Sequence, residues 1–127
     1  MRYLPGLIFA SFLCVFPVKA QTFKNGSELM KDCSAAIKQM DTPSSTPTLT
    51  DAPAVWRCAD FIDGFLQGYA EGLLGKTAEP DFCVDEVPNR EILRAVLKFL
   101  NDHPADLYNS AGSLVWSALY HSFPCKN

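Results

Sequence analysis

Cys58-Ala-Asp-Phe-Ile-Asp-Gly-Phe-Leu-Gln-Gly-Tyr-Ala-Glu-Gly72 is the stretch that decides the fold of this chain. Apolar side chains recur along it at helical spacing, which predicts one long helix over about residues 53–75. Its apolar arc consists of Val55, Cys58, Ala59, Phe61, Ile62, Phe65, Leu66, Tyr69, Ala70 and Leu73, and a narrow polar strip consists of Asp60, Asp63, Gln67 and Glu71. We expect this helix to be the centre of a small bundle.

Three glycines line up between the polar strip and the apolar arc: Gly64, Gly68 and Gly72. Each costs roughly 1 kcal/mol relative to alanine in a helix interior. Close approach of another helix would explain why side chains are missing here. Two interpretations stay open: packing against another helix of the same chain, or the seam of a homodimer or a groove for a partner.

The first twenty residues have the pattern of a secretory signal peptide. Arg2 precedes an apolar run from Leu7 to Val18, and Val18-Lys19-Ala20 resembles a cleavage site. The run is shorter than the roughly 20 apolar residues that a membrane span needs. The sequence therefore predicts a cleaved signal peptide over residues 1–20 and a single mature domain over residues 21–127.

The expected mature domain is acidic. It carries 9 basic and 14 acidic side chains, a net charge of −5. Such a charge gives it no electrostatic reason to bind nucleic acid or an anionic membrane surface.

Helical periodicity returns in three further segments. The first spans about residues 27–40, with Asn25 or Ser27 as its cap. A proline-rich loop over residues 41–53 follows it, and Asp51 and Pro53 at the end of this loop can cap the next helix and occupy its first turn. A third helix begins at Pro88 and ends at residues 101–104, and a fourth begins between residues 104 and 110 and ends at residues 123–125. No segment alternates with period two, so we predict an all-α, four-helix bundle.

The mature domain holds four cysteines, Cys33, Cys58, Cys83 and Cys125, which allow three pairings. Cys33 and Cys58 lie on the inward faces of consecutive helices. Cys83 precedes the third helix and Cys125 follows the fourth, so an antiparallel hairpin of those helices would bring them together. We therefore predict bridges 33–58 and 83–125, which an oxidising compartment would permit.

Candidate catalytic residues are scarce. The two histidines are His103 and His121. His121 and Cys125 could be two of the four ligands of a zinc site, but no second closely spaced pair of ligands accompanies them. A disulfide is the better interpretation of Cys125. Asp60, Asp63 and Glu71 could be paired carboxylates for acid–base chemistry, or simply a solvated face. The sequence predicts no catalytic residue, metal or cofactor, and favours a binding module over an enzyme.

The order of motifs resembles a known family. Leu29-Met-Lys-Asp-Cys33 is followed by Cys58-x-x-Phe-Ile-x-Gly64, by Phe82-Cys83, by Val96-x-x-Phe-Leu-x-x-His-Pro104 and by Ala111-x-x-Leu-Val-x-x-Ala-Leu-x-x-x-Phe-Pro-Cys125. This is similar to the Tai/Rap family of periplasmic immunity proteins, which protect bacteria against peptidoglycan amidases delivered by type VI secretion. The chain departs from the family at Asp60-Phe61, where glycine and tyrosine are frequent, and at Val84-Asp85, where proline often follows the third cysteine.

The resemblance implies an all-helical periplasmic inhibitor that forms a homodimer, as several relatives do, binds an amidase effector and occludes its active site. Its motifs are scaffold positions, so they do not give the interface. Our hypothesis for the interface combines the polar strip (Asp60, Asp63, Glu71) with an acidic loop (Glu79, Asp81, Asp85, Glu86). A periplasmic acid-stress chaperone is the alternative function, and a secreted enzyme with an unrecognised site is a third.

Overall fold

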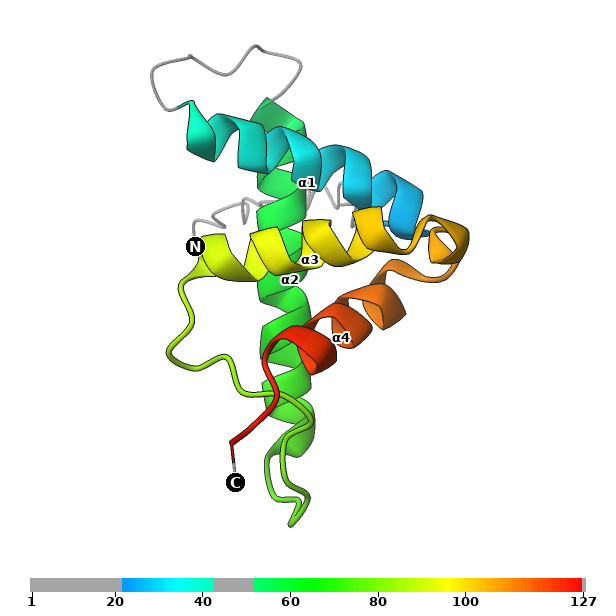
Figure 1. Ribbon diagram of the computed structural model, residues 1–127. Coiled ribbons are helices and arrows are strands. Elements are labelled where there is room, and N and C mark those ends of the chain that lie inside the picture. Colours follow the sequence, from blue (N-terminus) through cyan, green and yellow to red (C-terminus); the bar gives the residue numbers. More distant parts are fainter. Residues whose placement is uncertain (1–21, 43–51, 127) are drawn as a thin grey trace, which may run out of the picture.

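The computed structural model describes residues 22–42 and 52–126 (Figure 1). These residues form four α-helices and one short 3-10 helix, and no strand: α1 (Gly26–Asp41), α2 (Ala52–Leu73), α3 (Asn89–Asp102), η1 (Pro104–Asp106) and α4 (Ala111–Ser122). The predicted all-α fold of four helices is confirmed. The predicted signal peptide, Asp51 and most of the proline-rich loop lie outside the described residues, so the predicted domain boundary stays a prediction.

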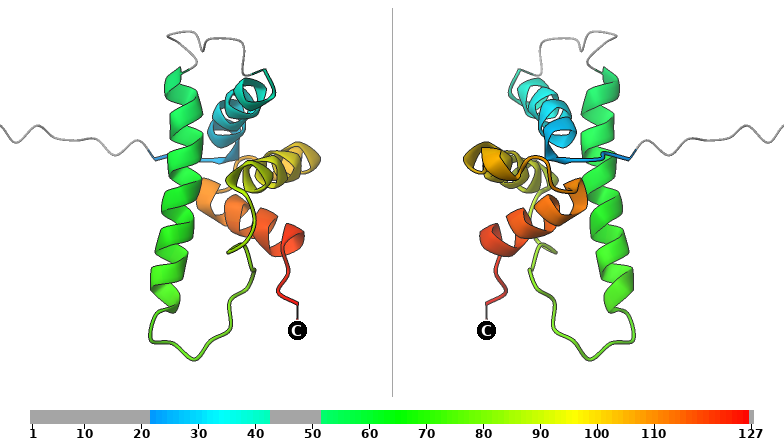
Figure 2. Two further views of the ribbon diagram at one scale, coloured as in Figure 1. Left: turned by 90° about the vertical axis from the view of Figure 1, so that its left-hand side faces the viewer. Right: turned by 90° about the vertical axis from the view of Figure 1, so that its right-hand side faces the viewer.

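The long helix α2 forms one wall of the molecule rather than its centre. Figure 2 shows α1, α3 and α4 all on the same side of α2, and α3 lies between α1 and α4. Only Cys58 and Ile62 of α2 are fully buried; most of the predicted apolar arc is half-buried, and Ala70 is exposed. The expectation of a helix surrounded by the other three is therefore wrong, because one face of α2 has no helix against it among the described residues.

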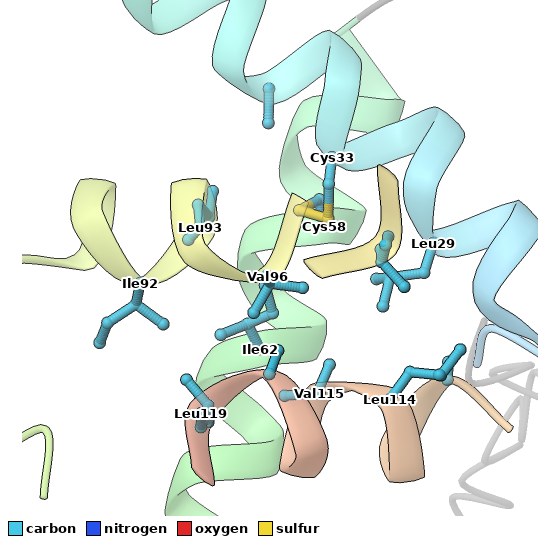
Figure 3. Close-up of a cluster of buried hydrophobic side chains, with 14 of the residues drawn as sticks. Leu29, Cys33, Cys58, Ile62, Ile92, Leu93, Val96, Leu114, Val115 and Leu119 are labelled. Carbon is cyan, nitrogen blue, oxygen red and sulfur yellow. A yellow bond between two sulfur atoms is a disulfide. The ribbon is translucent and has the colours of Figure 1, made fainter. Parts of the chain in front are cut away.

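The core is built mainly by α1, α3 and α4, with α2 contributing Cys58 and Ile62 (Figure 3). Every core helix supplies apolar side chains at helical spacing, as the sequence predicts. The largest fully buried side chains are Leu29, Ile62, Leu93, Leu100, Leu119, Val96, Val115, Cys33 and Cys58.

Both predicted disulfides are present. Cys33 of α1 is bonded to Cys58 of α2, with Cα atoms 5.1 Å apart. Cys83, before α3, is bonded to Cys125, after α4, with Cα atoms 4.9 Å apart. The first bridge holds α1 against α2, and the second closes the open ends of the α3–α4 hairpin.

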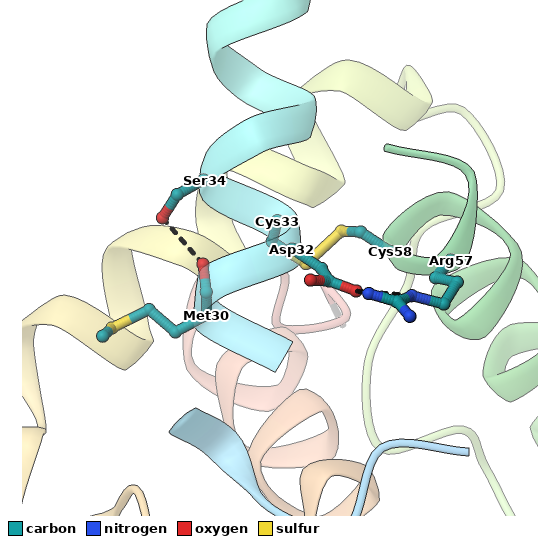
Figure 4. Close-up of a disulfide and its surroundings, with 6 residues drawn as sticks. All are labelled: Met30, Asp32, Cys33, Ser34, Arg57 and Cys58. Carbon is teal, nitrogen blue, oxygen red and sulfur yellow. Dashed lines mark hydrogen bonds and ion pairs between the residues drawn. A yellow bond between two sulfur atoms is a disulfide. The ribbon is translucent and has the colours of Figure 1, made fainter. Parts of the chain in front are cut away.

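Two charged contacts join helices close to these bridges. The guanidinium of Arg57 on α2 donates from Nε and Nη2 to Oδ2 of Asp32 on α1, at 2.8 and 2.6 Å, beside the Cys33–Cys58 bond (Figure 4). Asp32 is 3% exposed, so this pair satisfies a buried carboxylate that would otherwise be costly. The pair joins positions 25 residues apart, and no periodicity or motif of the sequence points to it.

The second contact holds the end of α1 against α3. Arg90 and Arg94 on α3 both donate to the carboxylate of Asp41, the last residue of α1. The hydrogen bond from Arg90 is the largest effect on the pKa of Asp41 and lowers it; desolvation opposes this, and the hydrogen bond from Arg94 and the charges of both arginines lower the pKa further. Because a lowered folded pKa stabilises the folded state only while the carboxylate is charged, this contribution is lost as the pH falls through that pKa.

The start of α1 is fitted closely against the segment before α4. Asn25 caps the helix, because its Oδ1 accepts a hydrogen bond from the backbone N–H of Glu28 at 3.1 Å. It is one of the two caps that the sequence predicted. The N–H groups of Gly26 and Ser27 donate to backbone carbonyls of residues 109 and 107, each at 3.2 Å. A Cβ atom at Gly26 would lie 2.4 Å from Cδ1 of Leu114 and 3.2 Å from the Cα of residue 107.

The contact at Gly26 predicts that Gly26→Ala destabilises the protein. We expect a loss of about 1–3 kcal/mol in the free energy of unfolding, measured by urea denaturation, because the added methyl group overpacks the junction. Gly64→Ala is the matched control: no described atom lies within 4 Å of its added Cβ, so it should stabilise α2 by up to about 1 kcal/mol. Equal effects of the two substitutions would contradict this description of the packing.

Candidate partner-binding surface

The last turns of α2 and the loop over residues 74–88 form one end of the molecule, beyond α4 (Figure 1). Gly75, at φ +74°, ends α2 in the left-handed conformation that glycine adopts without strain. The loop then returns to α3 past the Cys83–Cys125 bond, and the N–H of Cys83 donates to the carbonyl of Phe123 at 2.9 Å. The loop is therefore tied to the end of α4 by a covalent bond and a backbone hydrogen bond.

Asp81 ties the same loop to α2 and α4 through its side chain. The Tyr69 hydroxyl donates to Oδ2 of Asp81 at 2.9 Å and accepts from the Asp81 backbone N–H at 2.7 Å. Nε1 of Trp116 donates to the same Oδ2 at 3.3 Å. Side chains from two helices thus converge on one carboxylate.

The electrostatics of Tyr69 suit this role. Desolvation is the largest effect and raises the pKa of its hydroxyl; the hydrogen bond from the Asp81 backbone N–H lowers this pKa, and the side-chain hydrogen bond to Asp81 raises it. A raised folded pKa keeps the hydroxyl protonated at neutral pH. It can therefore remain the donor that Asp81 needs, and this stabilisation is lost only as the pH rises through the raised pKa.

An apolar groove lies between α2 and the loop. Phe82 is 3% exposed and stacks on Tyr69 with ring centroids 4.5 Å apart, which forms its floor. The groove has a volume of about 480 Å³. Its lining consists of Leu66, Gln67, Tyr69, Ala70, Leu73, Pro80, Phe82, Val84, Asp85, Val87, Asn89 and Ile92.

The predicted interface residues are not brought together at one point. Glu79, Asp85 and Glu86 are exposed on the loop, whereas Asp81, also exposed, is engaged with Tyr69 and Trp116. On α2, Asp60 and Glu71 are exposed and Asp63 is half-buried. Glu71 lies in the last turn of α2, next to the loop, but eleven residues of helix place Asp60 about 16 Å further along.

The three glycines of α2 do not contact another helix of the chain. A Cβ added at Gly64, Gly68 or Gly72 would meet no described atom within 4 Å. The interpretation that these glycines pack against another helix of the same chain is therefore wrong for the described residues, because α1, α3 and α4 lie on the other side of α2 (Figure 2). A homodimer seam or partner groove at this face stays a prediction.

Neither histidine lines the apolar groove. Nδ1 of His103 is 2.8 Å from the carbonyl of Phe99, and Nδ1 of His121 is 2.7 Å from the carbonyl of Ser117. Cys125 is bonded to Cys83, so it does not form a zinc site with His121. In the described part of the chain, no group of three or more side chains has the arrangement of a metal site.

Comparison with known protein families matches residues 25–125 to the Rap1a immunity proteins. The chain belongs to this family. The match spans all four helices and both disulfides, so the resemblance seen in the motifs is confirmed. Comparisons with curated proteins and with solved structures find no match. Membership identifies the chain as an immunity protein of type VI secretion, whose partner is a cognate effector toxin.

Sequence reasoning missed the residues that hold this Rap1a-family surface in place. Tyr69 reads as one member of the apolar arc, and Trp116 lies on α4, 35 residues beyond Asp81. No periodicity links positions this far apart. The only signal available was the presence of polar atoms on two large aromatic residues, which usually have a partner when they are partly buried.

Removing the carboxylate of Asp81 should loosen the loop. We expect Asp81→Asn to reduce the free energy of unfolding by about 1–3 kcal/mol, since it weakens two hydrogen bonds to a charged acceptor. Faster hydrogen exchange over residues 76–88 should accompany the loss. Asp85→Asn is the control, because Asp85 is exposed on the same loop and has no ion pair with a described residue; identical stability and exchange in the two variants would contradict the role of Asp81.

Proposed function

We propose that this chain binds a peptidoglycan amidase effector of type VI secretion and inhibits it by covering its active site. Family membership supports an immunity function. The observation that carries the finer proposal is the acidic loop at the exposed end of α2, which is held by Cys83–Cys125 and by Asp81. A loop that is ordered before binding loses little entropy when it enters a cleft.

Charge supports the same surface. Residues 71–91 carry six acidic and two basic side chains, a net charge of −4. Glu79, Asp85 and Glu86 are exposed there, and no ion pair among the described residues involves them. These carboxylates are therefore available to donors and cations around an amidase cleft, and they would speed association by electrostatic steering.

The periplasm is the proposed place of action. The family is typically secreted or periplasmic, and two disulfides fit an oxidising compartment. Within the described ranges, no helix is long and apolar enough to cross a membrane. Export by the predicted signal peptide would place the inhibitor where peptidoglycan is attacked. On this proposal the chain acts by binding rather than by catalysis, and family membership favours it over an acid-stress chaperone.

A homodimer through α2 remains part of the proposal. The face that carries Gly64, Gly68 and Gly72 is exposed, and it has no atom of the described chain within reach of an added Cβ. Because glycine has no side chain, two copies of α2 could approach each other closely across such a face. This face is directed away from the core, so a dimer formed through it leaves the fold of each chain unchanged.

The direct test combines the purified mature chain with candidate amidase effectors of type VI secretion, first of all any that is encoded next to its gene, and follows hydrolysis of peptidoglycan. We expect inhibition that is complete at a 1:1 ratio of chains. An amidase that remains fully active at an excess of the chain would reject the proposal.

Neutralising the free loop carboxylates should weaken this complex. We expect Glu79→Gln with Glu86→Gln to raise the Kd at low salt by roughly threefold to thirtyfold, because rim charges contribute mainly through long-range attraction. Asp81 is left intact because it holds the loop. Asp102→Asn with Asp106→Asn removes the same charge at the end of α3 and in η1 and should leave the Kd unchanged. Equal effects of the two pairs would show that the loop has no special role.

A further inference from the structure

The groove beside the acidic loop is not used by the proposed insertion of that loop. Its volume of about 480 Å³ is within the range of sites that hold organic ligands or protein side chains. Most of its lining is apolar, including Leu66, Leu73, Val87 and Ile92, and Tyr69 stacks on the buried Phe82 at its floor. An apolar surface of this kind gains free energy when a partner removes it from water.

The walls of the groove are fixed before any partner arrives. Tyr69 is held by two hydrogen bonds to Asp81. Phe82 precedes Cys83, whose disulfide and backbone hydrogen bond tie it to the segment after α4. A side chain that enters therefore meets a formed pocket, which is the condition under which one buried residue can dominate binding energy.

Acidic side chains lie on the segments that form the groove. Asp85 is part of the lining and is exposed, and Glu71, Glu79 and Glu86 are exposed on the segments that form the groove. No ion pair among the described residues neutralises any of the four. The chemistry that complements this site is an apolar side chain with positive charge next to it.

Building on the proposed function, we propose that this groove receives an apolar side chain of the effector that is flanked by lysine or arginine. The apolar side chain fills the space above Phe82, and the flanking cations face Asp85 and the neighbouring glutamates. The effector is then held at two adjacent places, by its cleft around the loop and by this anchor in the groove. The anchor supplies affinity, and the charges supply orientation.

The test measures the Kd of the mature chain for a catalytically inactive variant of the amidase effector used in the inhibition test. Ala70→Phe places a ring in the groove from an exposed position of α2, so it should not disturb the core. We expect the Kd to rise at least roughly tenfold, as for the loss of a buried anchor. Ala105→Phe, at an exposed position of η1, is the matched control and should leave the Kd unchanged.

A second pair of variants tests the charge on the rim. Asp85→Lys should also raise the Kd and should reduce its dependence on salt concentration, since it replaces an attraction with a repulsion. Asp106→Lys makes the same charge change in η1 and should do neither. Neither Asp85 nor Asp106 belongs to the core, so this pair keeps the test open even if Ala70→Phe lowers the stability of α2.

The outcomes separate this inference from the proposed function. A wild-type chain that neither binds nor inhibits the effector rejects both. A wild-type chain that inhibits normally, with an unchanged Kd for Ala70→Phe, rejects the groove alone. If Ala70→Phe changes only the oligomeric state of the free chain in light scattering, the groove belongs to a second copy of this chain, and the inference is again wrong.

Discussion

The Cys83–Cys125 bond is the constraint on which the binding end of this molecule depends. The segment between α2 and α3 has no regular secondary structure, and it lies at the edge of the core with Phe82 as its buried residue. Closing a loop of 42 residues lowers the entropy of the unfolded chain by an amount worth about 4 kcal/mol on the chain-entropy estimate. Asp81 then fixes the loop locally through Tyr69 and Trp116. The bond and the carboxylate together turn an irregular loop into a surface with a fixed shape.

The position of α2 explains how a small domain can offer so much free surface. The other three helices cover only one side of it, so its glycine face and its last turns stay open (Figure 2). The Cys33–Cys58 bond and the Asp32–Arg57 pair hold its first half against α1. The second half is held mainly through the loop, by Tyr69 and Phe82. A strong attachment at one end thus leaves the other end available to a partner.

The sequence predicted the features that depend on local periodicity and chain order. Helical spacing placed all four helices, and the order of helices and cysteines was enough to choose one pairing out of three. The sequence did not predict which face of α2 is covered, because periodicity shows which residues share a face but not what packs on that face. For the same reason, close packing within the chain was the first interpretation of Gly64, Gly68 and Gly72. The links from Asp81 to Tyr69 and Trp116, and the burial of Asp32 against Arg57, join residues 12 to 35 positions apart, and they required the tertiary structure.

The central claim is that the end formed by the last turns of α2 and the disulfide-held loop is the surface that meets the effector. Hydrogen exchange of the mature chain, free and in complex with the inactive effector, tests it most directly. We expect slower exchange on binding over residues 66–92, with α1 (Gly26–Asp41) unchanged. Slower exchange confined to α1, or to the far end of α3 and η1, with residues 66–92 unaffected, would contradict it.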